Sequence, residues 1–461
     1  MATQYLTSIN PVTNEKLHAY PIIDAPTIET KIQNAQDAYL QNKINSIEER
    51  TTLLKQLAEQ LKLEKESLAS MATLEMGKPY KQSIAEVEKC AMSLEYYADN
   101  GAQFLEPEIV NVGAKKSAIC YQPLGVVLAI MPWNFPFWQA YRALGPIILA
   151  GNSMLLKHAS NVSGCSTMME EIANKANWPK GLFQSLIFPS SQMNSIIAHP
   201  TIQAVTFTGS TIAGKIVAAE AAKHLKKQVL ELGGSDAYIV LEDADIDLAA
   251  KICTDSRLIN SGQSCIAAKR FIVVEKVADE FTRKVKAIME KVKYGDPFND
   301  DFKLGSIARK DLRDQLHQQV VESLAKGAKL LCGGELPEGP GAFYPATVLS
   351  NVQKGMPAYD EELFGPVAAI IVAKDEEEAI LIANDTEYGL GAAIFSKDLE
   401  RAEKLAIERV EAGSVFVNEL VSSKPQLPFG GIKQSGYGRE LSYLAPREFS
   451  NIKTILIESG K

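Results

Sequence analysis

One stretch decides the fold of this chain: Ala204-Val205-Thr206-Phe207-Thr208-Gly209-Ser210-Thr211-Ile212-Ala213-Gly214-Lys215. Its first five residues are apolar or β-branched and predict a buried strand, Gly209 favours a tight turn, and the residues after the turn predict a helix. A strand that passes through a short turn into a helix is typical of βαβ units. The stretch therefore predicts an α/β fold with a mostly parallel sheet.

The same stretch has the features of a phosphate site. Free N–H groups and the positive end of the dipole at a helix start attract a phosphate, and Ser210 and Thr211 add hydroxyl groups there. The dinucleotide fingerprint Gly-x-Gly-x-x-Gly is absent. Gly209, Gly214 and Lys215 come close to a P-loop, but Ile216 stands where that motif needs a hydroxyl for Mg²⁺. A capping turn without a ligand is the other alternative.

Strands alternate with helices on both sides of this stretch. Residues 26–104 have helical periodicity, and the final stretch, 449–457, alternates loosely and lacks a partner nearby in sequence. Short apolar runs that predict strands are 126–131, 153–156, 182–188, 204–208 and 228–232, and then, after Gly233-Gly234, 237–241, 270–274, 328–331, 367–372 and 414–417. We expect two α/β domains, with ligands bound at the carboxyl ends of the strands.

Composition limits the classes of function. The chain has 461 residues, 46% hydrophobic and 23% charged, which is an ordinary balance for a globular protein. Its net charge of −8 opposes general binding to nucleic acid or an anionic membrane surface. The six cysteines have no metal-ligand spacing, so we expect no metal site. The start of the chain has no signal-peptide pattern, and we expect a reduced, cytoplasmic protein.

Cys265 is the candidate nucleophile. It follows Gly262, Gln263 and Ser264, which are small or polar, so a substrate can reach its thiol more easily than that of a core cysteine. Cysteine attacks as the thiolate and needs neighbours that favour the charge or a base that takes the proton. A small buried hydrophobe is the alternative for any free cysteine.

Two further residues stand at predicted strand ends. Asn134 lies between Pro132 and Pro136, which fix the backbone, so its amide can be aimed at a developing oxyanion. Glu231 precedes Gly233-Gly234 and is placed for general-base work. A structural turn amide and a solvated carboxylate are the alternatives for these two residues.

The ordered series of motifs resembles the aldehyde dehydrogenase superfamily. The motifs are 132–136 (Pro-Trp-Asn-Phe-Pro), 207–210 (Phe-Thr-Gly-Ser), 231–234 (Glu-Leu-Gly-Gly), 262–265 (Gly-Gln-Ser-Cys), 361–367 (Glu-Glu-Leu-Phe-Gly-Pro-Val), and 428–431 (Pro-Phe-Gly-Gly) with 435–440 (Ser-Gly-Tyr-Gly-Arg-Glu). The resemblance implies an NAD(P)-binding domain of Rossmann-like type at 1–109 and 124–234, and an α/β catalytic domain at 235–440. It also implies an oligomerisation β-flap at 110–123 and 441–461, which would form a homodimer or homotetramer.

The resemblance assigns a role to each motif. Cys265 would attack the aldehyde carbon, Asn134 and the Cys265 backbone N–H would hold the oxyanion, and Glu231 would activate the water that releases the acid. Hydride would pass to a nicotinamide cofactor between the two covalent states, thiohemiacetal and thioester. The cofactor would be bound by Trp133, Lys157, Ser160, Gly209, Ser210, Leu232, Glu362 and Phe364.

The cofactor preference follows from a departure from the family pattern. Strongly NAD-selective members resemble Lys-x-x-Glu after the second strand, where this chain has Lys157-His158-Ala159-Ser160. A Glu repels a 2′-phosphate, whereas Ser160 beside Lys157 accommodates one, so we expect NADP to be accepted and preferred, with NAD as the weaker alternative. Pro189-Ser190-Ser191 replaces the usual glycine-rich adenine loop.

The substrate prediction depends on Arg142 and Ser423. Arg142 is the single charge of an apolar helix and needs an anion, which is either an internal carboxylate or the distal carboxylate of a semialdehyde. Ser423 falls where the succinate-semialdehyde dehydrogenase branch places a carboxylate-binding serine, whereas Arg257 does not align with that branch's second arginine. The sequence thus predicts oxidation of succinate semialdehyde to succinate. The alternatives are glutarate semialdehyde or aliphatic aldehydes, or a catalytically silent relative.

Overall fold

The decisive stretch forms strand β8 (Ile202–Thr208) and helix α8 (Thr211–Lys223), as predicted. The structure is a computed structural model that describes residues 4–459. Ser210 caps α8, because its side chain accepts a hydrogen bond from the Ala213 N–H at 3.4 Å. The strand places Gly209 and Ser210 at the carboxyl edge of a sheet, where ligands bind in α/β folds.

The sheet that contains β8 has the order β17-β9-β8-β5-β6-β7. Its other strands are β5 (Val126–Met131), β6 (Ser153–His158), β7 (Phe183–Ser185), β9 (Lys227–Glu231) and β17 (Gly436–Tyr437). All neighbours pair in parallel except β17, which runs antiparallel to β9. Alternate residues of β5 enter two different cores: Val126 and Leu128 enter one, and Val127 and Ala129 the other. Both faces are therefore covered, as a parallel sheet requires.

Eight helices belong to this first lobe: α1 (Ala25–Asn42), α2 (Ile47–Leu63), α3 (Lys65–Met76), α4 (Tyr80–Phe104), α5 (Trp138–Leu149), α6 (Ser163–Lys175), α7 (Met193–Ala198) and α8. The predicted helical region, 26–104, is confirmed as α1 to α4. Helix α5 is buried along its whole length and packs between α4 and the sheet. It therefore links α4 to the strands that position the site.

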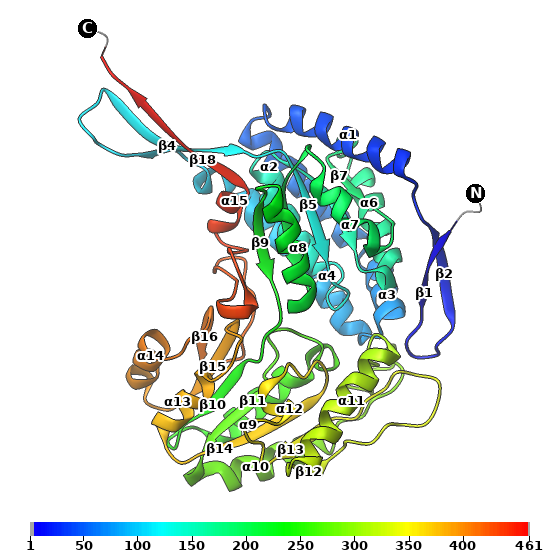
Figure 1. Cartoon of the computed structure of the whole chain (residues 1–461), viewed down its shortest axis with the longest axis vertical. Helices are drawn as coiled ribbons and strands as arrows, with labels where there is room; N and C mark the ends of the chain where they lie inside the picture. Colours follow the sequence, from blue (N-terminus) through cyan, green and yellow to red (C-terminus); the bar gives the residue numbers. More distant parts are fainter. Residues whose placement is uncertain (1–3, 460–461) are drawn as a thin grey trace.

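A second α/β lobe lies below the first in Figure 1. Its sheet has the order β12-β13-β14-β11-β10-β15-β16, parallel except for the edge strand β12. The strands are β10 (Ala237–Val240), β11 (Arg270–Val274), β12 (Lys329–Cys332), β13 (Thr347–Ser350), β14 (Val367–Ala373), β15 (Gly391–Phe395) and β16 (Ser414–Val417). The helices are α9 (Ile246–Leu258), α10 (Glu275–Met289), α11 (Lys310–Ala325), α12 (Pro357–Asp360), α13 (Glu376–Asn384) and α14 (Leu399–Glu408).

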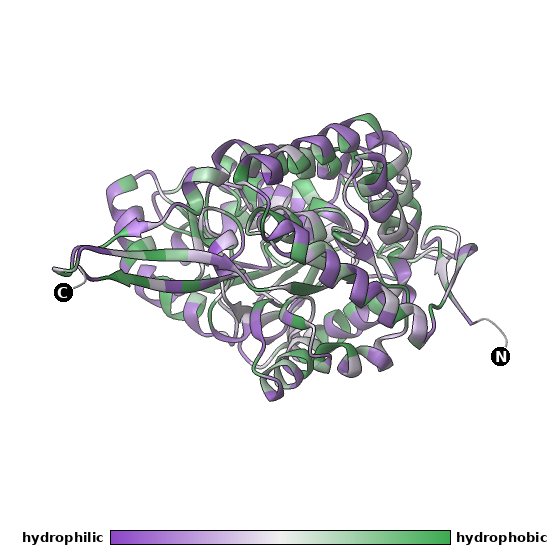
Figure 2. Cartoon of the chain, turned by 90° about the horizontal axis from the view of Figure 1, so that it is seen from above, coloured by the Kyte–Doolittle hydropathy of each residue, from purple (hydrophilic) through white to green (hydrophobic). Residues whose placement is uncertain are grey.

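A three-stranded antiparallel sheet forms an arm that projects from the first lobe (Figure 1). It consists of β3 (Glu108–Ile109), β4 (Lys116–Pro123) and β18 (Ser450–Ile457), and β18 pairs with β4 along its full length. The last strand, which lacks a partner nearby in sequence, thus pairs with β4 of the same chain. Figure 2 shows apolar and polar residues mixed along the arm, and the exposed apolar ones include Ile109, Val112, Ile452 and Leu456.

Three details of the structure do not coincide with the predicted boundaries of the domains and the β-flap. Those boundaries remain predictions. The arm's sheet begins at Glu108. Residues 436–437 pair with the first sheet rather than the second, and helix α15 (Leu444–Glu448) packs on α5 rather than in the arm. A hairpin of β1 (Tyr5–Ile9) and β2 (Lys16–Pro21) precedes α1 and was not predicted. Within residues 4–459, no helix combines the length and hydropathy that a bilayer span requires.

Candidate active site

A cavity of about 390 Å³ opens between the carboxyl edges of the two sheets. Its wall includes residues of both lobes, from Pro132 in the first to Phe364 in the second. The predicted site residues that line it are Trp133, Asn134, Gly209, Ser210, Leu232, Cys265, Glu362 and Phe364. Glu231, Arg142, Ser423, Lys157 and Ser160 do not line this cavity and lie behind or beyond it.

The loop before Cys265 is held in a strained conformation. Asn260 and Ser261 both have a φ of 53°, in the left-handed region that non-glycine residues rarely adopt. Gly262 follows with a φ of 77°, and a Cβ there would lie 2.2 Å from the Gly365 carbonyl. Such strain persists only where the surroundings enforce it, and it is typical of functional loops.

Buried hydrogen bonds enforce this conformation. The Asn260 side chain donates to the carbonyls of Asn134 at 2.6 Å and Gln263 at 3.1 Å. The Gln263 side chain donates to the Ser306 carbonyl at 3.3 Å and accepts from the Ala308 N–H at 2.9 Å. The nucleophile loop is therefore fixed to both lobes.

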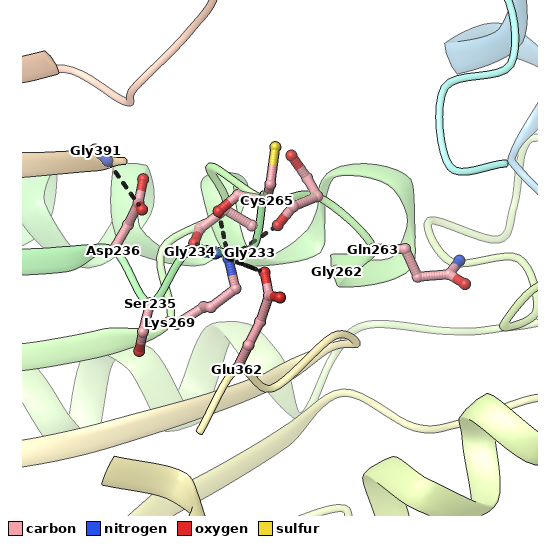
Figure 3. A network of polar contacts seen from close by, with 12 residues as sticks. Gly233, Gly234, Ser235, Asp236, Gly262, Gln263, Cys265, Lys269, Glu362 and Gly391 are labelled. Atoms are coloured by element: carbon pink, nitrogen blue, oxygen red, sulfur yellow. Dashed lines mark hydrogen bonds and ion pairs between the residues drawn. The ribbon is translucent and has the colours of Figure 1, made fainter. Parts of the chain in front are cut away.

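Lys269 supports Cys265 from below. Its ammonium group donates to the carbonyls of Ser264 at 3.0 Å and Cys265 at 2.6 Å, and lies 3.4 Å from the Glu362 carboxylate. Figure 3 shows the Cys265 sulfur pointing away from this network. Lys269 was not predicted as a site residue, although it stands four positions after the cysteine.

The surroundings of Cys265 favour its neutral thiol. Burial raises its pKa to about 12, while the positive charges of Lys269 and Arg142 oppose the rise. The thiol still keeps part of its surface exposed and lines the cavity. Because the thiolate is the nucleophile, a base must remove the proton before or during attack.

The Asn134 amide lies beside the nucleophile loop. Its Nδ2 donates one hydrogen to the Gln263 carbonyl at 3.1 Å, which leaves the second hydrogen for another acceptor. The backbone N–H of Cys265 donates to no acceptor among residues 4–459. The site therefore contains two donors that an oxyanion can use.

Two buried residues that the sequence did not reveal hold the Asn134 loop. The Glu86 carboxylate on α4 accepts hydrogen bonds from the N–H groups of Phe137 at 2.8 Å and Trp138 at 2.9 Å, at the start of α5. The His158 side chain donates from Nε2 to the Pro136 carbonyl at 2.8 Å. No local pattern distinguishes Glu86 from other charged residues of an amphipathic helix, so only the tertiary fold reveals its role.

Glu231 is the last residue of β9 and is only 2% exposed. Neither of its carboxyl oxygens has a hydrogen-bond partner among the described residues. Burial raises its pKa to about 8, the nearby Glu440 carboxylate adds to the rise, and Arg142 opposes it. An unpartnered carboxyl with a pKa near neutrality suits a general base.

Arg142 has an internal partner. Its guanidinium group pairs with the Glu440 carboxylate, lies 4.8 Å from the centre of the Phe429 ring and is 2% exposed. The internal carboxylate was one of the two alternatives from the sequence, and it is present, although the Nε and Nη2 of Arg142 donate no hydrogen bond among the described residues. Binding of a substrate carboxylate by Arg142 stays a prediction. Arg257 is also buried and donates to the Gly262 carbonyl, so it supports the nucleophile loop.

Ser423 is buried, and two side chains donate hydrogen bonds to its hydroxyl oxygen. The donors are Lys89 Nζ at 2.8 Å and Trp138 Nε1 at 3.1 Å. Lys89 was not predicted from the sequence. It brings a second positive charge near Arg142.

The cavity fits a nicotinamide dinucleotide at its open side. The Glu362 carboxylate accepts a hydrogen bond from the Gly234 N–H at 3.1 Å, and a Cβ on Gly233 would lie 2.7 Å from that carboxylate. Trp133 and Phe364 meet edge to face with ring centres 5.7 Å apart. The glycine thus leaves room beside a carboxylate that can accept ribose hydroxyls.

Lys157 places a positive charge near the carboxyl end of β6. Lys157 is buried, donates to the His158 carbonyl at 2.6 Å and has no carboxylate partner among the described residues. Burial lowers its pKa to about 8. Ser160 begins a short 3₁₀ turn three residues later. A cation without an anion in this position fits a ligand with ribose or phosphate oxygens.

Comparison with known proteins agrees with this geometry. The model of the aldehyde dehydrogenase family matches residues 1–455. The succinate semialdehyde dehydrogenase [NAD(P)+] of Escherichia coli (strain K12) is 46% identical over 97% of each chain. A probable succinate-semialdehyde dehydrogenase [NADP(+)] of Synechocystis sp. is 43% identical over 98% of this chain and 99% of its own.

A solved structure gives the same result for the fold. The crystal structure of succinic semialdehyde dehydrogenase from Streptococcus pyogenes, in complex with NADP+, superposes with a TM-score of 0.96 at 38% identity. The match covers 99% of this chain and 100% of that one. The chain belongs to the aldehyde dehydrogenase family. It is an NAD(P)-dependent oxidoreductase that acts on aldehydes, and it has the aldehyde dehydrogenase fold.

Proposed function

We propose that this enzyme oxidises succinate semialdehyde to succinate, with NADP as the preferred cofactor and NAD as the weaker alternative. The observation that carries the chemistry is that Cys265 and Asn134 share one cavity with Glu362 and Phe364. The substrate is supported by the names of the relatives, which are succinate-semialdehyde dehydrogenases at 46% and 43% identity. The cofactor preference is supported by Ser160 beside Lys157.

The reaction begins at the Cys265 thiol. The thiol proton passes to water, since part of the Cys265 surface is exposed, and the sulfur attacks the aldehyde carbon and forms a thiohemiacetal. The oxygen of this adduct carries the developing negative charge, and the Asn134 Nδ2 and the Cys265 backbone N–H donate to it. Removal of one such donor typically costs about 3 kcal/mol of transition-state stabilisation.

The second half of the reaction releases the acid. The bound nicotinamide cofactor supplies the acceptor for the hydride that leaves the thiohemiacetal carbon. The product on Cys265 is a thioester, and Glu231 takes a proton from the water that attacks it. The thiolate leaves as the carboxylic acid forms, and Cys265 is free for the next turnover.

We assign Glu362 and Lys157 to two different parts of the cofactor. Glu362 would accept hydrogen bonds from the ribose next to the nicotinamide, since its carboxylate lies by the Gly233-Gly234 turn. Lys157 and Ser160, at the end of β6, would hold the other ribose. The start of α8 would favour the phosphates between them.

Initial rates on a small panel of substrates test the proposed function. The panel contains succinate semialdehyde, glutarate semialdehyde and butanal, each with NADP and with NAD. We expect the highest kcat/KM for succinate semialdehyde with NADP. Equal or higher kcat/KM for butanal would contradict the substrate and favour an aldehyde dehydrogenase of broad specificity.

Ser160→Glu is expected to reverse the cofactor preference. A carboxylate at this position repels the 2′-phosphate of NADP but accepts the ribose hydroxyls of NAD. We expect kcat/KM for NADP to fall by about 10- to 100-fold and that for NAD to change little, since like-charge contacts cost a few kcal/mol. Ser160→Ala is the matched control because it removes the hydroxyl without adding charge. An unchanged ratio of NADP to NAD in Ser160→Glu would refute the assignment of Ser160.

We also propose that the arm of β3, β4 and β18 joins two copies of the chain. Its projection from the body and its exposed apolar residues support this, because an exposed apolar sheet favours association. Ile452 and Leu456 lie on one face of β18, at positions four residues apart. The double variant Ile452→Glu, Leu456→Glu is expected to halve the mass measured by light scattering or reduce it further. An unchanged mass would count against the arm.

A further inference from the structure

Three side chains from distant segments meet at one hydroxyl group near the start of α5. Lys89 comes from α4, Trp138 is the first residue of α5, and Ser423 follows β16. Both Lys89 Nζ and Trp138 Nε1 donate to Ser423 Oγ, and Lys89 Nζ also lies 4.2 Å from the centre of the Trp138 ring. Trp138 and Ser423 are buried, whereas Lys89 keeps part of its surface exposed.

The positive charge of Lys89 is not balanced by a carboxylate. No Asp or Glu oxygen of residues 4–459 lies within 4.0 Å of its Nζ. The neighbouring cations differ in this respect, because Lys78 pairs with Glu86 and Arg142 pairs with Glu440. Burial and, to a smaller extent, the charge of Arg142 lower the pKa of Lys89 to about 8. An anion that binds here is therefore favoured by both cations.

Lys89 and Ser423 keep hydrogen-bond donors that no described residue uses. Lys89 uses one of its three N–H bonds for Ser423, and the other two have no acceptor among the described residues. The Ser423 hydroxyl accepts two hydrogen bonds, and its own hydrogen has no acceptor among them either. Two N–H groups and one O–H group are thus available to the two oxygens of a carboxylate.

The cluster lies next to the catalytic cavity. Gln139 follows Trp138 in the chain and lines the cavity together with Asn134 and Cys265. Arg142 is one turn further along α5, and its charge acts on both Cys265 and Lys89. Trp138 belongs to the buried core against which Cys265 packs, and the proposal requires the far end of a short substrate to reach Lys89 from there.

We propose that Lys89 binds the distal carboxylate of the semialdehyde, with Ser423 and Trp138 holding its ammonium group in place. This inference rests on the proposed function and deepens it, since it names the cation that selects an anionic aldehyde. It also changes the role of Arg142, whose charge is paired with Glu440 and acts on Lys89 and Cys265 at a distance. Lys89 is then a specificity-determining residue that no sequence motif indicates.

The test compares Lys89→Met with the wild type on succinate semialdehyde and on butanal, which has the same chain length and no charge. We expect kcat/KM for succinate semialdehyde to fall by about 10- to 100-fold, the usual range for loss of a hydrogen bond to a charged group. The kcat/KM for butanal should stay within about threefold, because no interaction with that substrate is lost. Lys89→Arg retains the charge and should keep more of the preference than Lys89→Met. Lys81→Met, on the exposed side of the same helix, is the matched control.

The outcomes separate the two proposals. A wild type without preference for succinate semialdehyde over butanal contradicts the proposed function and this inference together. A wild type with that preference, and a Lys89→Met variant that keeps it or loses both activities equally, overturns only the inference. Thermal unfolding of each variant verifies the fold, and Lys89→Gln, which can still hydrogen-bond Ser423, serves if Lys89→Met is unstable.

Discussion

Cys265→Ala is expected to lose aldehyde oxidation while it still binds NADP. The thiol forms the covalent bond to the substrate, and Cys265 is the only cysteine among the described residues that line the cavity. We expect kcat to fall by at least about 10⁴-fold, as when the nucleophile of other covalent enzymes is removed. The measurement is the initial rate of NADPH formation, with cofactor binding followed by the quenching of Trp fluorescence.

The control for this variant is a cysteine outside the site. Cys332 lies on the edge strand β12, is partly exposed and has no contact with the cavity. Cys332→Ala should therefore retain full activity. A Cys265→Ala enzyme that keeps more than a few per cent of wild-type kcat would contradict covalent catalysis, whatever the result with Cys332.

Glu231→Gln is expected to separate the two halves of the reaction. Without the general base the thioester forms but is hydrolysed slowly, so NADPH appears in a rapid burst followed by a slow steady rate. We expect steady-state kcat to fall by about 10²- to 10⁴-fold, the usual contribution of a general base. The measurement is stopped-flow absorbance of NADPH, with the burst amplitude compared with the concentration of active sites.

The pKa of Glu231 also predicts how kcat depends on pH. Burial raises the pKa of Glu231 to about 8, and only the ionised carboxylate can accept a proton. The wild-type kcat should therefore rise with pH through an inflection near 8, and Glu231→Gln should lack this inflection. In Glu440→Gln, the negative charge that raises this pKa is removed, so the inflection should move to lower pH. A slow variant without a burst, or an inflection that survives in Glu231→Gln, would assign the proton transfer to another group.

Much of the fold follows from local pattern in the sequence. Strands β5, β11 and β16 lie where the apolar runs 126–131, 270–274 and 414–417 predict them, because each is a short run of mostly apolar residues bounded by turn residues. Strand β15 was missed because Gly391-Ala392-Ala393 has little intrinsic preference for strand. It forms because β10 and β16 pair with it on either side. Strand β13 was missed for a similar reason, since its four residues follow a loop rich in Pro and Gly.

Some residues of the site could also be predicted from local sequence patterns, and others could not. Cys265, Asn134 and Glu362 could be predicted because each stands within a short motif, and the structure brings them to one cavity. Lys89 and Glu86 could not be predicted, because their roles depend on the contact of α4 with the start of α5, about 50 residues away in sequence. The interpretation of Arg142 depended on a similar long-range contact. Its carboxylate partner, Glu440, is nearly 300 residues away, so the sequence left open whether that partner was internal.

The covalent intermediate provides the most direct test of the account. Glu231→Gln is mixed with succinate semialdehyde and NADP, quenched in acid within the burst, digested and analysed by mass spectrometry. We predict a succinyl group on the peptide that carries Cys265, and none when NADP is omitted. NADPH formation with an unmodified Cys265 peptide, or a succinyl group on a different residue, would contradict the account.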